Sequence, residues 1–278
     1  GFGMAHAADF SEFPLIGAES RWFTVWQIAP NVKAIFEPHH FQEVISYLIE
    51  GETGAVLFDS GMGIGNMKAL VESLTDKPIT LVCSHGHFDH VGGAWQFDGA
   101  HKLCTPDSVA EAAEGFSLPE DDENRSLAAF SIVGTLWFDP KTFRVKPYKV
   151  IPAEEGEVFD LGGRRLRVVA APGHSDDGMM LADDENRLLF TGDTVYPGPL
   201  YAHLSGEHGA EVYRRTLEKL APEFGSYTLL CSHNSPVMEG AALAEMAEAF
   251  SAVERGDVSG YEYMRHRRYD FDGFSIVM

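Results

Sequence analysis

The sequence predicts a layered fold of strands and helices, of either the α/β or the layered α+β class. Short apolar runs typical of buried strands alternate with helical segments in both halves of the chain. Polar residues recur directly after these runs, at the place where open α/β sheets hold their ligands. Because the chain has 278 residues, we expect a single domain over residues 1–278.

The first half opens with a predicted hairpin. Residues 43–49 and 55–58 are strand-like, and a glycine-containing loop joins them. A polar turn follows at 59–63, and residues 66–74 carry the apolar stripe of a helix. The short apolar run at 79–83 predicts a buried strand directly before a histidine-rich loop.

An irregular segment follows a predicted strand at 102–104 and a predicted helix at 108–114. Residues 115–147 mix acidic side chains, aromatic side chains and prolines. Irregular segments of this length are usually functional or mobile, so we expect a lid insertion here. A surface excursion packed on the core is the alternative interpretation.

The second half repeats the pattern of a strand followed by a polar loop. Helices are expected at 210–220 and 241–253, and the chain ends in a C-terminal helix and tail at about 239–278. The predicted strands and the loops after them are 165–170 before 172–175, 187–190 before 191–193, and 227–231 before 232–234.

Charge and composition limit the classes of partner and the cellular location that we expect. The formal net charge of −21 argues against nucleic acid and anionic membranes as partners, although bound metal ions would still allow an anionic small substrate. Three cysteines without a close pair predict free thiols and a cytoplasmic location. No apolar run approaches the roughly 20 residues of a membrane span. Gly1–Met4 looks like the remains of a tag before an initiator methionine, and no signal peptide is expected.

The strongest local signal is the run His85-x-His87-x-Asp89-His90. Neutral imidazoles and carboxylates suit a borderline cation such as Zn²⁺, and a loop after a strand can turn them toward two adjacent ions. Isolated histidines are usually surface or core residues, but that interpretation does not explain three histidines and an aspartate within six positions. Further candidate ligands stand at the ends of later strands: His174, Asp193 and His233.

This series of motifs, with Asp59 before it, resembles the signature of the metallo-β-lactamase superfamily. The resemblance implies a four-layer αββα sandwich of the α+β class. It also implies two Zn²⁺ ions, with iron or manganese as the other metals considered. Asp59 would hydrogen-bond a ligand histidine, or it simply caps its turn. The implied ligands are His85, His87 and His174 for the first ion, Asp89, His90 and His233 for the second, and Asp193 between them.

Two stretches resemble a narrower subgroup. Residues 85–93 and 192–200 are similar to the subgroup that includes an acyl-CoA thioesterase, and Tyr196 is placed like a tyrosine of homoserine-lactone lactonases. Packing against the wall of the site is the other interpretation of Tyr196. Asp193 is present and no cysteine occupies a ligand position, so the resemblance gives little support for β-lactam hydrolysis.

The implied reaction is hydrolysis of an ester, lactone or thioester of a small molecule. A water between the two ions would become acidic enough to attack a carbonyl carbon as hydroxide. Asp89 would orient this water or accept its proton, and Tyr196 would donate to the oxyanion or the leaving oxygen. The expected pocket wall is aromatic and apolar: Phe36, His39, His40, Phe41, Met62, Phe88, Trp137, Tyr201 and His203.

Other activities of the same superfamily stay open. A phosphodiesterase would share the ligand set, but a nuclease needs basic surface, and the one basic run, Arg265–Arg268, is interpreted as a solvated tail. A mononuclear iron enzyme of the persulfide dioxygenase type would use part of the set. A non-catalytic relic of the fold is disfavoured by the complete set of ligands. Monomer and homodimer both remain open.

Overall fold

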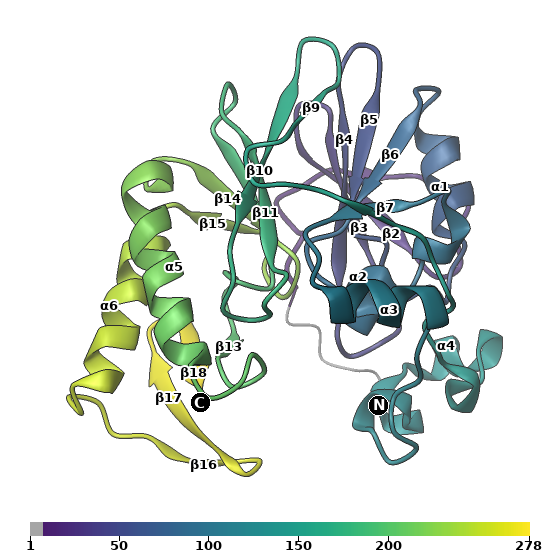
Figure 1. Cartoon of the computed structure of the whole chain (residues 1–278). Coiled ribbons are helices and arrows are strands. Elements are labelled where there is room, and N and C mark those ends of the chain that lie inside the picture. Colours follow the sequence, from purple (N-terminus) through teal and green to yellow (C-terminus); the bar gives the residue numbers. More distant parts are fainter. Residues whose placement is uncertain (1–7) are drawn as a thin grey trace.

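A computed structural model describes residues 8–278 of the chain (Figure 1). The stretch Gly1–Met4, interpreted above as a tag remnant, lies outside the described residues. No helix within residues 8–278 combines the length and the apolar character needed to cross a bilayer.

The first sheet has eight strands in sequence order, antiparallel from β1 to β5 and parallel from β5 to β8. The predicted hairpin is confirmed as β4 and β5, and the strand expected at 102–104 lies slightly earlier, as β7. The strands are β1 (Leu15–Ile16), β2 (Thr24–Ala29), β3 (Val32–Phe36), β4 (Ile45–Glu50), β5 (Ala55–Phe58), β6 (Ile79–Val82), β7 (Ala100–Lys102) and β8 (Val150–Pro152).

The second sheet has six strands in the order β15-β14-β12-β11-β10-β9. Only β12 and β14 pair in parallel, so the loops that follow these two strands emerge at the same edge. The strands are β9 (Val158–Asp160), β10 (Arg165–Ala170), β11 (Met179–Asp183), β12 (Leu188–Gly192), β14 (Thr228–Cys231) and β15 (Val237–Glu239).

The two sheets pack face to face, and helices cover both outer faces (Figure 1). One core lies between the sheets, where Tyr47 and Ile49 of β4 meet Phe190 of β12. Leu48 points to the opposite side because side chains alternate along a strand. The four-layer αββα sandwich is therefore confirmed. The helices are α1 (Met67–Leu74), α2 (Phe88–Val91) and α3 (Pro106–Glu114) beside the first sheet, and α5 (Gly209–Phe224) and α6 (Ala242–Glu254) on the second.

The segment at 115–147 is built from short helical turns rather than long elements. The Phe116–Val145 bridge closes its base, and a second bridge joins Phe130 to His40. Its elements are η2 (Glu123–Arg125), η3 (Leu127–Ala129), α4 (Ile132–Trp137) and η4 (Pro140–Thr142).

The C-terminal region corrects the predicted tail. After α6 the chain forms β16 (Tyr261–Tyr263), β17 (His266–Phe271) and β18 (Phe274–Val277), which join β13 (Pro199–Tyr201) in a third sheet of four strands. The basic run Arg265–Arg268 is therefore part of a hairpin and not a solvated tail. Arg268 pairs with Asp270 on the same strand at 2.9 Å.

Candidate metal centre

Seven side chains meet where the strands of the two central sheets end. Four of them follow β6, and the others follow β10, β12 and β14, so distant parts of the sequence converge at one edge. The ligand atoms within each of two groups lie within 4.8 Å of one another. The groups share Asp193: they are His85, His87, His174 and Asp193, and Asp89, His90, Asp193 and His233.

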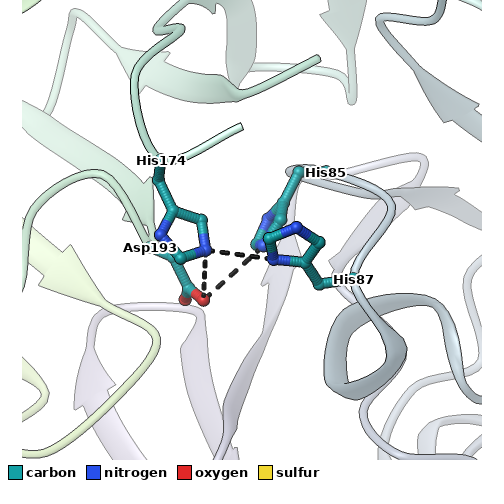
Figure 2. Close-up of side chains that lie close together, drawn as sticks. All are labelled: His85, His87, His174 and Asp193. Carbon is teal, nitrogen blue, oxygen red and sulfur yellow. Dashed lines mark hydrogen bonds and ion pairs between the residues drawn. The ribbon is translucent and has the colours of Figure 1, made fainter. Parts of the chain in front are cut away.

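Asp193 lies between the two groups. In the first group, its Oδ2 atom is 3.5 Å from Nε2 of His85 and 3.3 Å from Nε2 of His174. Nδ1 of His87 is 3.1 Å from the same His174 nitrogen, and Figure 2 shows these rings turned toward the carboxylate. This arrangement gathers three imidazoles and one carboxylate oxygen around a common point.

The second group is equally close. Nε2 of His90 lies 3.1 Å from Oδ2 of Asp193, and Nε2 of His233 lies 3.0 Å from Oδ1. Oδ2 of Asp89 is 3.2 Å from Nε2 of His233. Oδ2 of Asp193 therefore contacts histidines of both groups and Oδ1 contacts His233, so this carboxylate is common to the two groups.

The donor set fits metal ions. Nε2 of His85 and Nε2 of His90 are buried and make no hydrogen bond of acceptable geometry. Buried polar atoms are normally satisfied, so such nitrogens indicate a missing partner. Imidazole nitrogens with carboxylate oxygens are a ligand set typical of zinc. Cys83 and Cys231 are buried in the apolar cores and belong to neither group.

Hydrogen bonds behind the ligands fix the ring tautomers. Nδ1 of His90 donates to Oδ2 of Asp59 at 2.8 Å, which is the contact expected for Asp59. Nδ1 of His85 lies 2.9 Å from the Ser84 hydroxyl, which itself donates to Asp59. Because Nδ1 carries the proton, Nε2 keeps a lone pair directed at the centre.

A third such bond involves the backbone. Nδ1 of His233 donates to the carbonyl oxygen of Gln42 at 2.7 Å. Sequence reasoning missed both Ser84 and Gln42. The position of Ser84 directly before His85 was a usable signal, whereas a carbonyl acceptor leaves no trace in side-chain identity.

Burial and mutual charge set the protonation of the cluster. Burial lowers the pKa of His85, and the neighbouring His90 lowers it further, so His85 is neutral as a metal ligand must be. Burial alone would raise the pKa of Asp193. His233 and His90 outweigh that effect and hold the pKa of Asp193 well below its usual range, so it is a carboxylate.

Tyr196 lies beside the second group with its hydroxyl bonded to the backbone. Its hydroxyl donates to the carbonyl oxygen of Pro199, and its ring lies 5.6 Å from that of His233. A phenol has one proton, so this bond directs the donor away from the ligand cluster. The structure places Tyr196 as a buried wall residue beside the second group.

A cavity of about 480 Å³ opens over the two groups. Of the expected wall residues, Phe41, Phe88, Tyr201 and His203 line it. Its other lining residues are Gln42, His87, Asp89, Glu123, His174, Asp193, Tyr196, Pro199, Leu204, His233, Asn234, Tyr263, Met264, His266 and Val277.

Five residues expected at this wall lie elsewhere. Phe36 packs on Phe10 in the core between the sheets, with ring centroids 5.0 Å apart. Met62 is buried in a small separate core. The other three involve the segment at 115–147: Trp137 belongs to it and packs on His39 with ring centroids 5.4 Å apart, and His40 packs on its Phe130.

The cavity also has a wall that sequence reasoning missed. The hairpin of β16, β17 and β18 contributes Tyr263, Met264, His266 and Val277. Glu123 of η2 also reaches the cavity, so the segment at 115–147 borders it at one point.

Comparison with known proteins adds the family context. A family model described as metallo-beta-lactamase superfamily matches residues 43–232. Acyl-coenzyme A thioesterase MBLAC2 of Homo sapiens is 27% identical over 172 residues, which is 55% of this chain and 59% of that protein. Hydroxyacylglutathione hydrolase GloC of Haemophilus influenzae is 25% identical over 169 residues, which is 57% of this chain and 69% of that protein. The match therefore spans about three fifths of the thioesterase's length.

A solved structure confirms the fold. A metallo-beta-lactamase family protein from Thermus thermophilus superposes with a TM-score of 0.57 at 20% identity. The superposition covers 83% of this chain and 81% of that chain.

Proposed function

This chain belongs to the metallo-beta-lactamase superfamily, and from that membership we propose that it is a metal-dependent hydrolase of a small-molecule acyl bond. The substrate class is an ester, a lactone or a thioester. The observation that carries the proposal is the pair of ligand groups sharing Asp193 beneath an aromatic and apolar cavity. The names of the two relatives support it, because both describe hydrolysis of an acyl group from its carrier.

The proposed cofactor is a pair of zinc ions. His85, His87 and His174 would hold one ion, Asp89, His90 and His233 would hold the other, and Asp193 belongs to both groups. When bound, the ions supply Lewis acidity and lower the pKa of a water toward neutrality.

The side chains provide positioning and proton transfer. Asp89 is buried beside His233, so its carboxylate accepts the proton of the attacking water and returns it to the leaving group. Asp59, Ser84 and the Gln42 carbonyl keep the ligand rings in place. Tyr196, with its hydroxyl on Pro199, shapes the wall and excludes water.

The cavity favours acyl substrates over phosphodiesters. Among the described residues that line it, none is lysine or arginine, and phosphate recognition relies on such cations. The complete second group, Asp89, His90 and His233, favours a dinuclear centre over a mononuclear iron site.

The test is metal analysis combined with a substrate panel. Zinc-loaded protein is assayed on a p-nitrophenyl ester, a lactone, an acyl thioester and a phosphodiester, and zinc is counted by elemental mass spectrometry. We expect about two zinc ions per chain and acyl hydrolysis. His87→Ala and Asp193→Ala should lose metal, whereas His208→Ala, at an exposed histidine outside the cluster, should keep it. Cleavage of the phosphodiester without any acyl hydrolysis would contradict the proposal.

A further inference from the structure

We propose that the tip of the C-terminal hairpin, residues 263–266, selects the acyl group, and that Met264 contacts its hydrocarbon chain. This inference rests on the proposed acyl hydrolysis and names the part of the substrate that this wall receives. The tip lies beyond residue 232, where the match to the superfamily ends. The hairpin is therefore a feature of this chain outside the part that the family model covers.

The turn at the tip has an unfavourable local sequence. Tyr263 pairs with His266, so Met264 and Arg265 form a two-residue loop, with φ angles of 44° and 68°. Two-residue loops with both φ angles positive strongly prefer Asn-Gly, and larger side chains are strained there. Strained backbone is retained most often where the side chain it presents has a function. Met264 lines the cavity, and Arg265 does not.

The surrounding contacts hold this tip against the cavity. Strand β18 pairs in parallel with β13, which sets Val277 opposite Tyr201. The rings of His203 and His266 stack with centroids 3.7 Å apart and planes 18° apart. The Arg268 guanidinium lies 5.1 Å from the ring of Tyr263. The His203–His266 stack therefore holds the tip, the β13–β18 pairing holds the hairpin that carries it, and the Arg268–Tyr263 contact lies within the hairpin.

The chemistry of this wall fits an uncharged hydrocarbon. Tyr201, Leu204, Met264 and Val277 present apolar and aromatic surface. Burial, and next the neighbouring Tyr263, raise the pKa of Tyr201 to about 12, so this phenol stays neutral. No lysine or arginine within residues 8–278 lines the cavity, so this wall offers no cationic side chain to a phosphorylated carrier. A methionine is unbranched and flexible, so its side chain adapts to acyl chains of different length.

The experiment compares a series of acyl chains at one leaving group. Zinc-loaded wild-type protein, Met264→Asn and Arg265→Gly are assayed on p-nitrophenyl acetate, butyrate, hexanoate and octanoate. Both variants relieve the same strained turn, so both should have a Tm equal to or above that of the wild type. Only Met264→Asn removes a side chain from the cavity.

The expected result separates the two variants. In the wild type, kcat/KM rises by up to about fourfold for each buried methylene. Met264→Asn lowers the octanoate-to-acetate ratio of kcat/KM by about tenfold, as expected for losing contact with about two methylenes. Arg265→Gly keeps the wild-type ratio. If Met264→Asn also keeps the wild-type ratio, or if both variants lower it equally, the inference is overturned.

A binding measurement separates this inference from the proposed activity. Butyrate and octanoate are titrated calorimetrically into the same three zinc-loaded proteins. If these esters, the lactone and the acyl thioester are all left uncleaved, the proposed function fails. The wall assignment then stands if octanoate binds more tightly than butyrate and only Met264→Asn removes the difference. It falls if chain length has no effect on binding.

Discussion

Replacing Asp59 with asparagine tests the hydrogen bonds that stand behind the ligands. Asp59 accepts three of them: Oδ1 from the Ser84 backbone amide at 2.7 Å, and Oδ2 from the Ser84 hydroxyl at 2.9 Å and Nδ1 of His90 at 2.8 Å. Asparagine keeps the first acceptor but puts an amide NH₂ group in place of Oδ2. That group cannot accept from Nδ1 of His90.

The amide also cannot accept from the Ser84 hydroxyl, but the bond lost at His90 sets the expected magnitude because His90 is itself in the cluster. A hydrogen bond to a charged group contributes about 1.5–3 kcal/mol, and loss of such a contact behind a metal ligand lowers metal affinity by about 10- to 100-fold. The amide favours the His90 tautomer with its proton on Nε2, which removes the lone pair that faces the centre. The loss should fall mainly on the ion held by Asp89, His90 and His233.

Competition with a chromophoric zinc chelator measures this effect. We expect Asp59→Asn to show one nearly normal zinc affinity and one weakened by about 10- to 100-fold. The exposed Asp98→Asn makes the same change in charge and should match the wild type in both steps. Two wild-type affinities in Asp59→Asn would refute the positioning role assigned to Asp59.

Three further predictions address proton transfer, packing and pH. Tyr196→Phe should lower kcat by less than about tenfold, because the Tyr196 hydroxyl is bound to the Pro199 carbonyl, whereas Asp89→Asn should lower kcat by about 100-fold or more. Equal losses of kcat in the two variants would contradict this. Lys102→Met leaves Asp177, now 2.7 Å from the fully buried lysine, without its cation and should lower the free energy of unfolding by about 3–5 kcal/mol in urea denaturation. The double variant Lys102→Met with Asp177→Asn should recover most of that loss. Burial raises the pKa of Glu37 from 4.5 to about 8, so the unfolded chain releases this proton at a lower pH than the folded chain does. From pH 5 to pH 8 the free energy of unfolding of the wild type should therefore fall, relative to that of Glu37→Gln, by up to about 4 kcal/mol. A difference between the two proteins that is the same at both pH values in urea denaturation would contradict this.

The ligand set could be predicted because each ligand follows a strand whose apolar run is legible in the sequence. The run at 79–83 forms β6 and is buried from Leu81 to Cys83, and the loop after it carries His85 and His87. Histidines and aspartates at successive strand ends converge when strands share an edge. This prediction does not depend on how the side chains of the core pack.

The pocket wall was harder to predict because it depends on which face of a buried strand each aromatic occupies. Phe36 ends a strand that is buried on both sides, and its side chain points between the sheets rather than to the cavity. Met62 follows a turn next to Asp59, but its side chain enters a separate core. Sequence position alone does not distinguish these directions.

The C-terminal hairpin was missed for a local reason. Its turn is Met264-Arg265 instead of a glycine-containing pair, and β17 carries charged residues at exposed and half-exposed positions. Pairing of β18 with β13, whose partner residues lie 76 positions earlier in the chain, stabilises the hairpin. Such a long-range partner cannot be read from the local sequence.

The most direct test of the metal centre is the rate of acyl hydrolysis as zinc is returned to chelator-stripped protein. We expect no hydrolysis by the stripped protein and a rate that rises until about two zinc ions are bound per chain. Undiminished hydrolysis by fully stripped protein would contradict a catalytic metal site at the cluster around Asp193.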